Sequence, residues 1–181
     1  MGRITLLLGG ARSGKSRRAL ELAETTTAER LVMIATAEAG DDEMAARIAS
    51  HRQERAAKWL TIEEPIDLPG AVASVPNALD LAAPPNSASA VIVIDCLTLW
   101  LSNLMHKGVP LETATDNLCK ALKASPFETV LISNEVGLGL VPETPLGREF
   151  RDAQGRLNQA AAGVADVVEF VAAGLPLRLK P

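Results

Sequence analysis

Residues 4–16 read ITLLLGGARSGKS, in which an apolar run leads directly into the pattern G-x-x-x-x-G-K-S. Between a strand and a helix, this pattern is typical of a loop that binds nucleotide phosphates. Its glycines let successive backbone N–H groups point at phosphate oxygens, and the helix expected over 15–25 adds the positive end of its dipole. We expect Lys15 to reach the β- and γ-phosphates and Ser16 to hold Mg²⁺. The chain is therefore predicted to bind a nucleoside triphosphate.

The other apolar runs predict a layered α/β sheet. Most are rich in Val, Ile and Leu without polar alternation, as buried parallel strands are, and helix signals separate them. The expected strands are 4–8, 31–35, 59–62, 91–95, 129–133, 167–171 and 177–180. A tight link, Ala172-Ala173-Gly174, predicts that the last two strands form an antiparallel hairpin at one edge. Residues 76–90, rich in Pro, Ala and Ser, are expected to form a surface loop.

Composition narrows the class of protein. A length of 181 residues suits one domain spanning 1–181. The formal net charge of −4 and an aromatic content of 3% argue against nucleic-acid binding. The chain contains no apolar stretch long enough to span a bilayer and no secretory pattern at its start. Cys96 and Cys119 lack metal-type spacing and are expected to be small buried residues. These features predict a single-domain cytoplasmic protein.

Ligands of parallel sheets bind beyond the carboxyl ends of the strands, so the residues that follow each strand are candidates. Thr36 follows the second predicted strand. Asp95 ends the run 91–95, where a carboxylate can support Mg²⁺ or its waters, although an aspartate there can also cap the next helix. Glu135 follows 129–133 and is either a base or Mg²⁺ contact or a solvated loop carboxylate. The residues alone do not decide between these alternatives for Asp95 and Glu135.

Residues 41–55, DDEMAARIASHRQER, predict an amphipathic helix that carries a histidine. His51 lies at the margin of the apolar stripe, and Arg47 and Arg55 are its i−4 and i+4 neighbours. Nearby cations disfavour a protonated imidazole, and a neutral imidazole is a nucleophile. His51 is then either a partly exposed residue among salt-bridging arginines or a nucleophile that forms a phosphoramidate. The second histidine, His106, follows the apolar run 97–105 and is expected at a helix end.

Six segments spread over nearly the whole chain occur together in one known family. They are GGARSGKS (9–16), IATAEAGDDEMAARIASHR (34–52), W-x-T-x-EEP (59–65), VIDCLTLWLSNLM (93–105), SNEVGLGLVPETPLGREFRDAQGRLNQ (133–159) and LPLRLK (175–180). A phosphate loop alone is common to many families, but its combination with DDEMAARI-x-x-H-R and NEVG-x-G-x-VP is close to diagnostic. In these segments the chain resembles the bifunctional adenosylcobinamide kinase/adenosylcobinamide-phosphate guanylyltransferase family of cobalamin biosynthesis.

The resemblance implies two reactions. In the first, ATP or GTP phosphorylates the aminopropanol hydroxyl of adenosylcobinamide. In the second, GTP guanylylates a histidine with release of pyrophosphate, and the GMP passes to adenosylcobinamide phosphate to give adenosylcobinamide-GDP. The histidine of the family corresponds to His51. The resemblance also implies a P-loop, RecA-like, mostly parallel sheet with helices on both faces and an antiparallel C-terminal edge hairpin, in a homo-oligomer that is most often a trimer.

The candidate site residues follow from the motif and the resemblance together. The catalytic residues are His51 and Lys15, and Ser16 and Asp95 are expected to hold Mg²⁺. Nucleotide contacts are expected at Gly9, Gly10, Ala11, Arg12, Ser13, Gly14, Lys15, Ser16, Ala35, Thr36, Ala37, Arg52, Gln53, Glu54, Arg55, Glu63 and Asp95.

Two other classes share the phosphate loop. A RecA-type ATPase would need a DNA- or protein-binding surface, and the acidic charge with few aromatic residues argues against DNA. A small GTPase would carry the guanine-specificity motif N-K-x-D, which the sequence does not contain.

Overall fold

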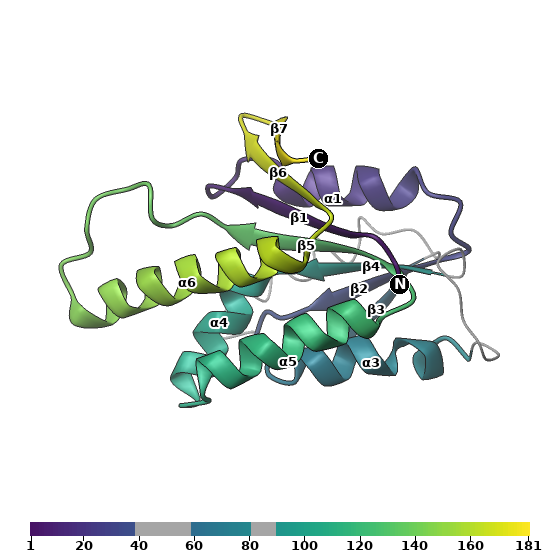
Figure 1. Cartoon of the computed structure of the whole chain (residues 1–181), viewed down its shortest axis with the longest axis horizontal. Coiled ribbons are helices and arrows are strands. Elements are labelled where there is room, and N and C mark those ends of the chain that lie inside the picture. Colours follow the sequence, from purple (N-terminus) through teal and green to yellow (C-terminus); the bar gives the residue numbers. More distant parts are fainter. Residues whose placement is uncertain (39–58, 81–89) are drawn as a thin grey trace.

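A seven-stranded sheet in the order β3-β2-β4-β5-β1-β6-β7 forms the centre of the computed structural model, which describes residues 1–38, 59–80 and 90–181 (Figure 1). The strands are β1 (Ile4–Gly9), β2 (Arg30–Ala35), β3 (Trp59–Glu63), β4 (Ala90–Asp95), β5 (Glu128–Asn134), β6 (Val167–Ala172) and β7 (Leu175–Lys180). All pairings are parallel except that of β6 with β7, which is antiparallel. The predicted parallel sheet and its C-terminal edge hairpin are confirmed, although β7 begins two residues earlier than expected.

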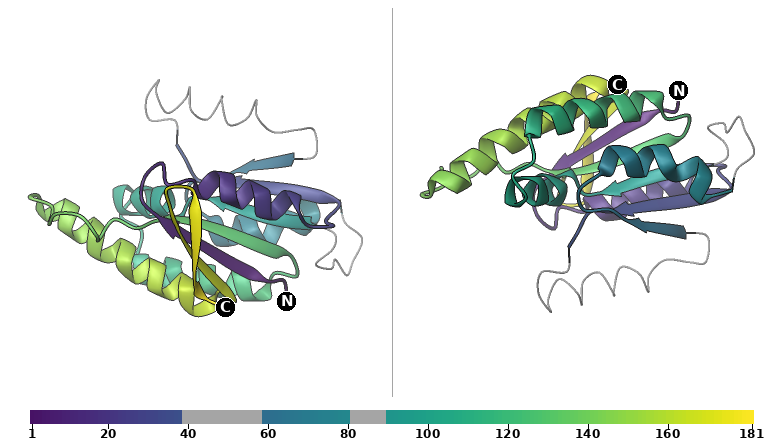
Figure 2. Two further views of the ribbon diagram at one scale, coloured as in Figure 1. Left: turned by 90° about the horizontal axis from the view of Figure 1, so that it is seen from above. Right: turned by 90° about the horizontal axis from the view of Figure 1, so that it is seen from below.

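Helices cover both faces of this sheet, as predicted. They are α1 (Lys15–Glu24), α3 (Leu68–Ala78), α4 (Leu97–His106), α5 (Leu111–Ala124) and α6 (Pro145–Val164). Figures 1 and 2 show α1 on one face and the other four on the opposite face. His106 is the last residue of α4, which confirms its expected place at a helix end. Within the described ranges, no helix combines the length and apolar character needed to cross a membrane.

The core has two parts because successive strand residues point to opposite faces. Leu7, Met33, Val91, Val93, Val130 and Ile132 pack with the α1 face, and Leu6, Val32, Ile34, Ile92, Ile94 and Leu131 pack with the four-helix face. Trp100, fully buried on the four-helix face, donates its indole N–H to the Ile66 carbonyl at 2.8 Å. Burial on both faces explains why the strands read as continuous apolar runs. Cys96 is buried as expected, whereas Cys119 is only half-buried.

The expected loop over 76–90 is wrong at its start. Helix α3 continues to Ala78 and contains Pro76 in its last turn. A proline lacks the N–H that would bond to the carbonyl four residues earlier, so Pro76 removes the bond to the Val72 carbonyl, and the helix ends two residues after it. Asp80 then turns the chain with a φ of 50°. Residues 81–89 of the expected loop lie outside the described residues.

Candidate active site

The phosphate loop joins β1 to α1 through backbone conformations that favour glycine. Gly14 is the N-cap of α1 and has a φ of 102°, and Arg12 also has a positive φ, of 55°. Helix α1 has no side-chain cap and no acidic residue in its first turn. Its first N–H groups therefore lack a side-chain acceptor, which is the arrangement that binds an anion at a helix N-terminus.

Lys15 lies at the centre of this loop and is only 7% exposed. Its Nζ donates to the Gly9 carbonyl at 2.9 Å and the Gly10 carbonyl at 2.6 Å, and lies 3.5 Å from the Ser13 hydroxyl. Burial lowers the pKa of the Lys15 ammonium, and the nearby Cys96 and Asp95 act in the opposite direction. The loop's own carbonyl groups thus hold the cation where phosphate oxygens would compete for it.

Ser16 and Asp95 come together across the carboxyl end of the sheet. The Ser16 hydroxyl donates to Asp95 Oδ2 at 3.1 Å. The N-cap of α4 is Cys96, so Asp95 does not cap that helix. A hydroxyl beside a carboxylate fits the Mg²⁺ site expected at these residues, where substrate phosphates and water complete the oxygen ligands. Within residues 1–38, 59–80 and 90–181, no group of three or more His, Cys, Asp or Glu is arranged to hold a metal ion.

Thr36 has a structural function in the sheet edge. Its hydroxyl donates to the Cys96 carbonyl at 2.7 Å and accepts the Cys96 N–H at 2.9 Å, while Asn103 donates to the Thr36 carbonyl at 2.8 Å. Thr36 is fully buried. These bonds fix the start of α4 beside the end of β2 and so position the neighbouring Asp95. The nucleotide contacts expected at Ala35, Thr36 and Ala37 stay predictions.

Glu63 lies on the same edge of the sheet but further out. It aligns with Ala35 in β2, which in turn aligns with Asp95 in β4. Two strand spacings separate Glu63 from Asp95 along the edge, a distance of roughly 10 Å. Its side chain is exposed. The predicted helix over 41–55, including His51, Arg52, Gln53, Glu54 and Arg55, lies outside the described residues.

A cavity of about 570 Å³ joins the loop to the strand ends. It is lined by Ala11, Arg12, Ser13, Gly14, Lys15, Ser16, Arg17, Asp95, Cys96, Ile132 and Asn134. The cavity therefore brings together six of the eight phosphate-loop residues and Asp95. It also contains Arg17 and Asn134, which sequence reasoning did not assign to the site.

Asn134 belongs in the site because β5 lies between β1 and β4 in the sheet. Its N–H donates to the Thr98 hydroxyl at 2.8 Å, and its carbonyl accepts from Asn158 at 3.1 Å. In the sequence, the only sign that Asn134 belongs to the site is that a polar residue follows a predicted strand directly. The next residue, Glu135, donates its backbone N–H to the Gly9 carbonyl, and its carboxylate accepts the Gly137 N–H at 2.7 Å. The Glu135 carboxylate thus forms a turn within its own loop.

The fold and this site define a P-loop protein of the nucleotide-binding class. Among solved structures, the assembled ATPase EscN of the enteropathogenic E. coli type III secretion system matches with a TM-score of 0.58 at 13% identity. The match covers 95% of this chain and 43% of that one, and at this identity it shows the fold alone. The family model CobU, "Cobinamide kinase / cobinamide phosphate guanyltransferase", matches residues 5–179. The chain therefore belongs to this family.

Curated relatives agree with this assignment over nearly their whole length. The bifunctional adenosylcobalamin biosynthesis protein CobP of Pseudomonas aeruginosa is 44% identical over 177 residues, which are 97% of this chain and 96% of the relative. The bifunctional adenosylcobalamin biosynthesis protein CobU of Salmonella typhimurium is 38% identical over 190 aligned positions, covering 97% and 98% of the two chains. The resemblance seen in the six sequence segments is thus confirmed, and the chain belongs to a family of enzymes.

Proposed function

We propose that this protein catalyses two successive steps of cobalamin biosynthesis in the cytoplasm. It phosphorylates the aminopropanol hydroxyl of adenosylcobinamide with ATP or GTP, and then transfers GMP from GTP to adenosylcobinamide phosphate. The observation that carries this proposal is the nearly full-length similarity to relatives named as bifunctional cobalamin biosynthesis proteins. The phosphate loop with its buried lysine supports it, because both steps require a bound triphosphate.

The kinase step needs positioning and charge neutralisation more than covalent chemistry. The substrate hydroxyl oxygen attacks the γ-phosphorus as the bond to the β–γ bridging oxygen breaks. Lys15 and the first N–H groups of α1 stabilise negative charge on the phosphates. Ser16 and Asp95 would hold Mg²⁺, which would neutralise further phosphate charge when bound. Asn134 lines the same cavity as Lys15, Ser16 and Asp95.

The guanylyl-transfer step uses His51 as a nucleophile. An imidazole nitrogen attacks the α-phosphorus of GTP, a P–N bond forms, and pyrophosphate leaves. A phosphate oxygen of adenosylcobinamide phosphate then attacks the same phosphorus, the P–N bond breaks, and adenosylcobinamide-GDP is released. Arg52, Gln53, Glu54 and Arg55 follow His51 and, with Glu63, are proposed to contact the nucleotide during this step. Because two in-line transfers replace one, the reactive GMP is stored on the enzyme between them.

We further propose that the protein is a homotrimer, as the family resemblance implies. Along β7, Leu175, Leu177 and Leu179 are all more than half exposed. Apolar side chains at a sheet edge are a cost in water that assembly would remove. Analytical ultracentrifugation at several protein concentrations tests this directly. A trimer mass at all concentrations is expected, and a monomer mass would contradict it.

Product analysis tests both activities together. The protein is incubated with adenosylcobinamide and either ATP or GTP as the only nucleotide. The corrinoid products are then separated and identified by mass spectrometry. With ATP alone we expect adenosylcobinamide phosphate. With GTP we expect adenosylcobinamide-GDP with an equal amount of pyrophosphate. Nucleotide hydrolysis without any modified corrinoid would refute the proposal and favour an ATPase.

A further inference from the structure

Helix α1 carries Lys15 and Ser16 in its first turn, so its placement on the sheet sets the geometry of the phosphate site. It packs against the strands through Ala19 and Ala23, both fully buried. Among the described residues it is the only helix on its face (Figures 1 and 2). Alanines allow close packing but interlock weakly, since they form no deep ridges and grooves. Leu20 and Leu22 add only partly buried contacts to this core, so polar contacts between α1 and the sheet also contribute to holding the helix in register.

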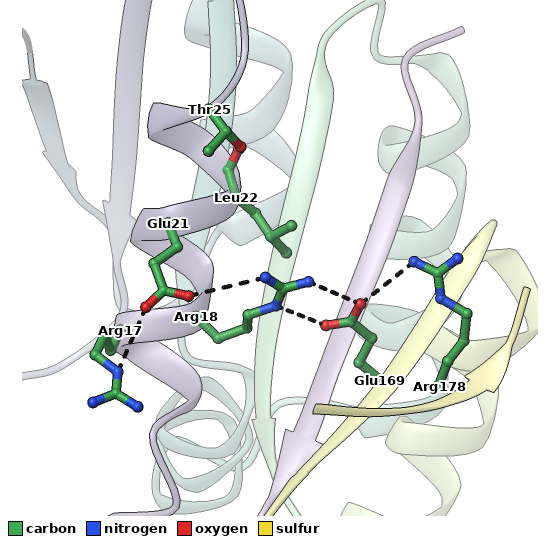
Figure 3. A network of polar contacts seen from close by, with 7 residues as sticks. All are labelled: Arg17, Arg18, Glu21, Leu22, Thr25, Glu169 and Arg178. Atoms are coloured by element: carbon green, nitrogen blue, oxygen red, sulfur yellow. Dashed lines mark hydrogen bonds and ion pairs between the residues drawn. The ribbon is translucent and has the colours of Figure 1, made fainter. Parts of the chain in front are cut away.

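An ion pair between the partly buried Arg18 and the buried Glu169 joins α1 to strand β6. Arg18 Nε donates to Glu169 Oε2 at 2.9 Å, and a second Arg18 nitrogen donates to Oε1 at 3.1 Å, which makes the pair bidentate (Figure 3). The Glu169 side chain is 4% exposed. Its hydrogen bonds to Arg18 hold the pKa of the carboxyl below its ordinary value. Arg18 lies one turn after Lys15, so this fork restrains the part of the helix nearest the phosphate loop.

The Glu169 carboxylate also ties the two strands of the terminal hairpin to one another. From β7, an Arg178 nitrogen lies 3.6 Å from Glu169 Oε1 (Figure 3). Arg178 is half-exposed and makes a longer contact than Arg18 does. Glu169 thus joins the hairpin to α1 by short, partly buried hydrogen bonds and to Arg178 of its own hairpin by a longer contact.

The turn of this hairpin touches the phosphate loop directly. The Gly174 N–H donates to the Ser13 carbonyl at 2.8 Å. A Cβ added to Gly14 would lie 3.1 Å from Gly174 Cα, and a Cβ added to Gly9 would overlap the Val171 carbonyl oxygen. Hairpin backbone and loop backbone are therefore in contact on one side of the loop, while Glu169 holds the helix that follows the loop.

We propose that the β6–β7 hairpin is a positioning element for the phosphate loop, and that Glu169 is a positioning residue for phosphate binding in both reactions. The inference rests on the proposed nucleotide site. When the fork between Arg18 and Glu169 is lost, α1 is free to shift along the sheet. Hydrogen bonds to phosphate weaken steeply with distance and angle, so a small shift of the loop reduces affinity even when the protein stays folded.

Binding of tripolyphosphate and of GTP, measured by calorimetry well below each variant's unfolding midpoint, tests this inference. Tripolyphosphate reports on the phosphate loop without any contribution from the base. Glu169→Gln keeps the size of the side chain but removes its charge, and we expect both ligands to bind about 10- to 100-fold more weakly. Arg18→Lys keeps a cation but loses the fork, and is expected to fall between wild type and Glu169→Gln.

Glu24→Gln is the matched control, because it removes an exposed carboxylate from the same helix without touching β6. It should bind both ligands like wild type. Folded Glu169→Gln and Arg18→Lys proteins that bind tripolyphosphate like wild type would overturn the inference, even if they unfold at lower temperature. If Glu169→Gln does not fold, Arg18→Lys decides by the same criterion. Failure of wild type to bind GTP would instead contradict the proposed function.

Discussion

Replacing Lys15 with methionine is expected to separate stability from activity. The substitution keeps a long unbranched side chain in the buried space and removes two close hydrogen bonds to the Gly9 and Gly10 carbonyls. Charged hydrogen bonds contribute about 1.5–3 kcal/mol each, whereas burying an ammonium costs several kcal/mol. Burial lowers the pKa of Lys15 despite the raising effects of Cys96 and Asp95, so desolvation of the ammonium offsets part of what its hydrogen bonds contribute. The free energy of unfolding of Lys15→Met should therefore stay within about 1.5 kcal/mol of wild type, or exceed it.

The same substitution should reduce both the kinase and guanylyl-transfer rates by about 10²–10³. Chemical denaturation and rate assays on the same preparation give the comparison. The free energy of unfolding, measured over a series of pH values, gives a second test. Because the folded-state pKa lies below the ordinary 10.5, the unfolded chain binds more protons between these values, and wild-type stability gains a rising contribution over that interval. Lys15→Met should lack this contribution. A Lys15→Met protein that loses several kcal/mol of stability, or that keeps normal turnover, would contradict this separation of stability from activity.

Three further substitutions test separate parts of the site. Asp95→Asn should keep the fold but weaken the Mg²⁺-dependence of nucleotide binding, and an unchanged Mg²⁺ titration would contradict a metal function for Asp95. The pKa of Glu169 lies below the ordinary 4.5, so its ion pair with Arg18 stabilises the fold fully above pH 4.5, and this contribution is lost as the pH falls through the folded-state pKa. The difference in unfolding free energy between wild type and Glu169→Gln should therefore shrink in that acid range. A difference that stays constant with pH would argue against the ion pair. Gly14→Ala, at a φ of 102°, should cost about 1–2 kcal/mol in chemical denaturation, and no loss would contradict the strain.

Local sequence chemistry was sufficient to predict the sheet, the phosphate loop and the terminal hairpin. Buried parallel strands read as apolar runs, glycines mark the backbone turn before Lys15, and a three-residue link between 171 and 175 leaves room only for a hairpin. The start of the loop at Pro76 was predicted wrongly because proline disfavours helix interiors, whereas α3 continues through Pro76 to Ala78.

The contacts that complete the site depend on sheet order and so were not visible in the sequence. Asn134 enters the cavity only because β5 lies between β1 and β4. Arg18 and Glu169 are 151 positions apart, and nothing local in either segment predicts that they meet. Thr36 was predicted as a ligand contact by its place after a strand, but the same place lets its hydroxyl bind Cys96.

Covalent labelling of wild type and His51→Ala with α-labelled GTP tests whether His51 carries the guanylyl group between the two transfers. Wild-type protein should retain label after denaturation, with the acid lability and alkali stability of a phosphoramidate. The His51→Ala protein should take up no label and make no adenosylcobinamide-GDP, yet still phosphorylate adenosylcobinamide, because the kinase step does not pass through that bond. Covalent GMP retained by His51→Ala, or wild-type protein that never takes up label, would contradict the account.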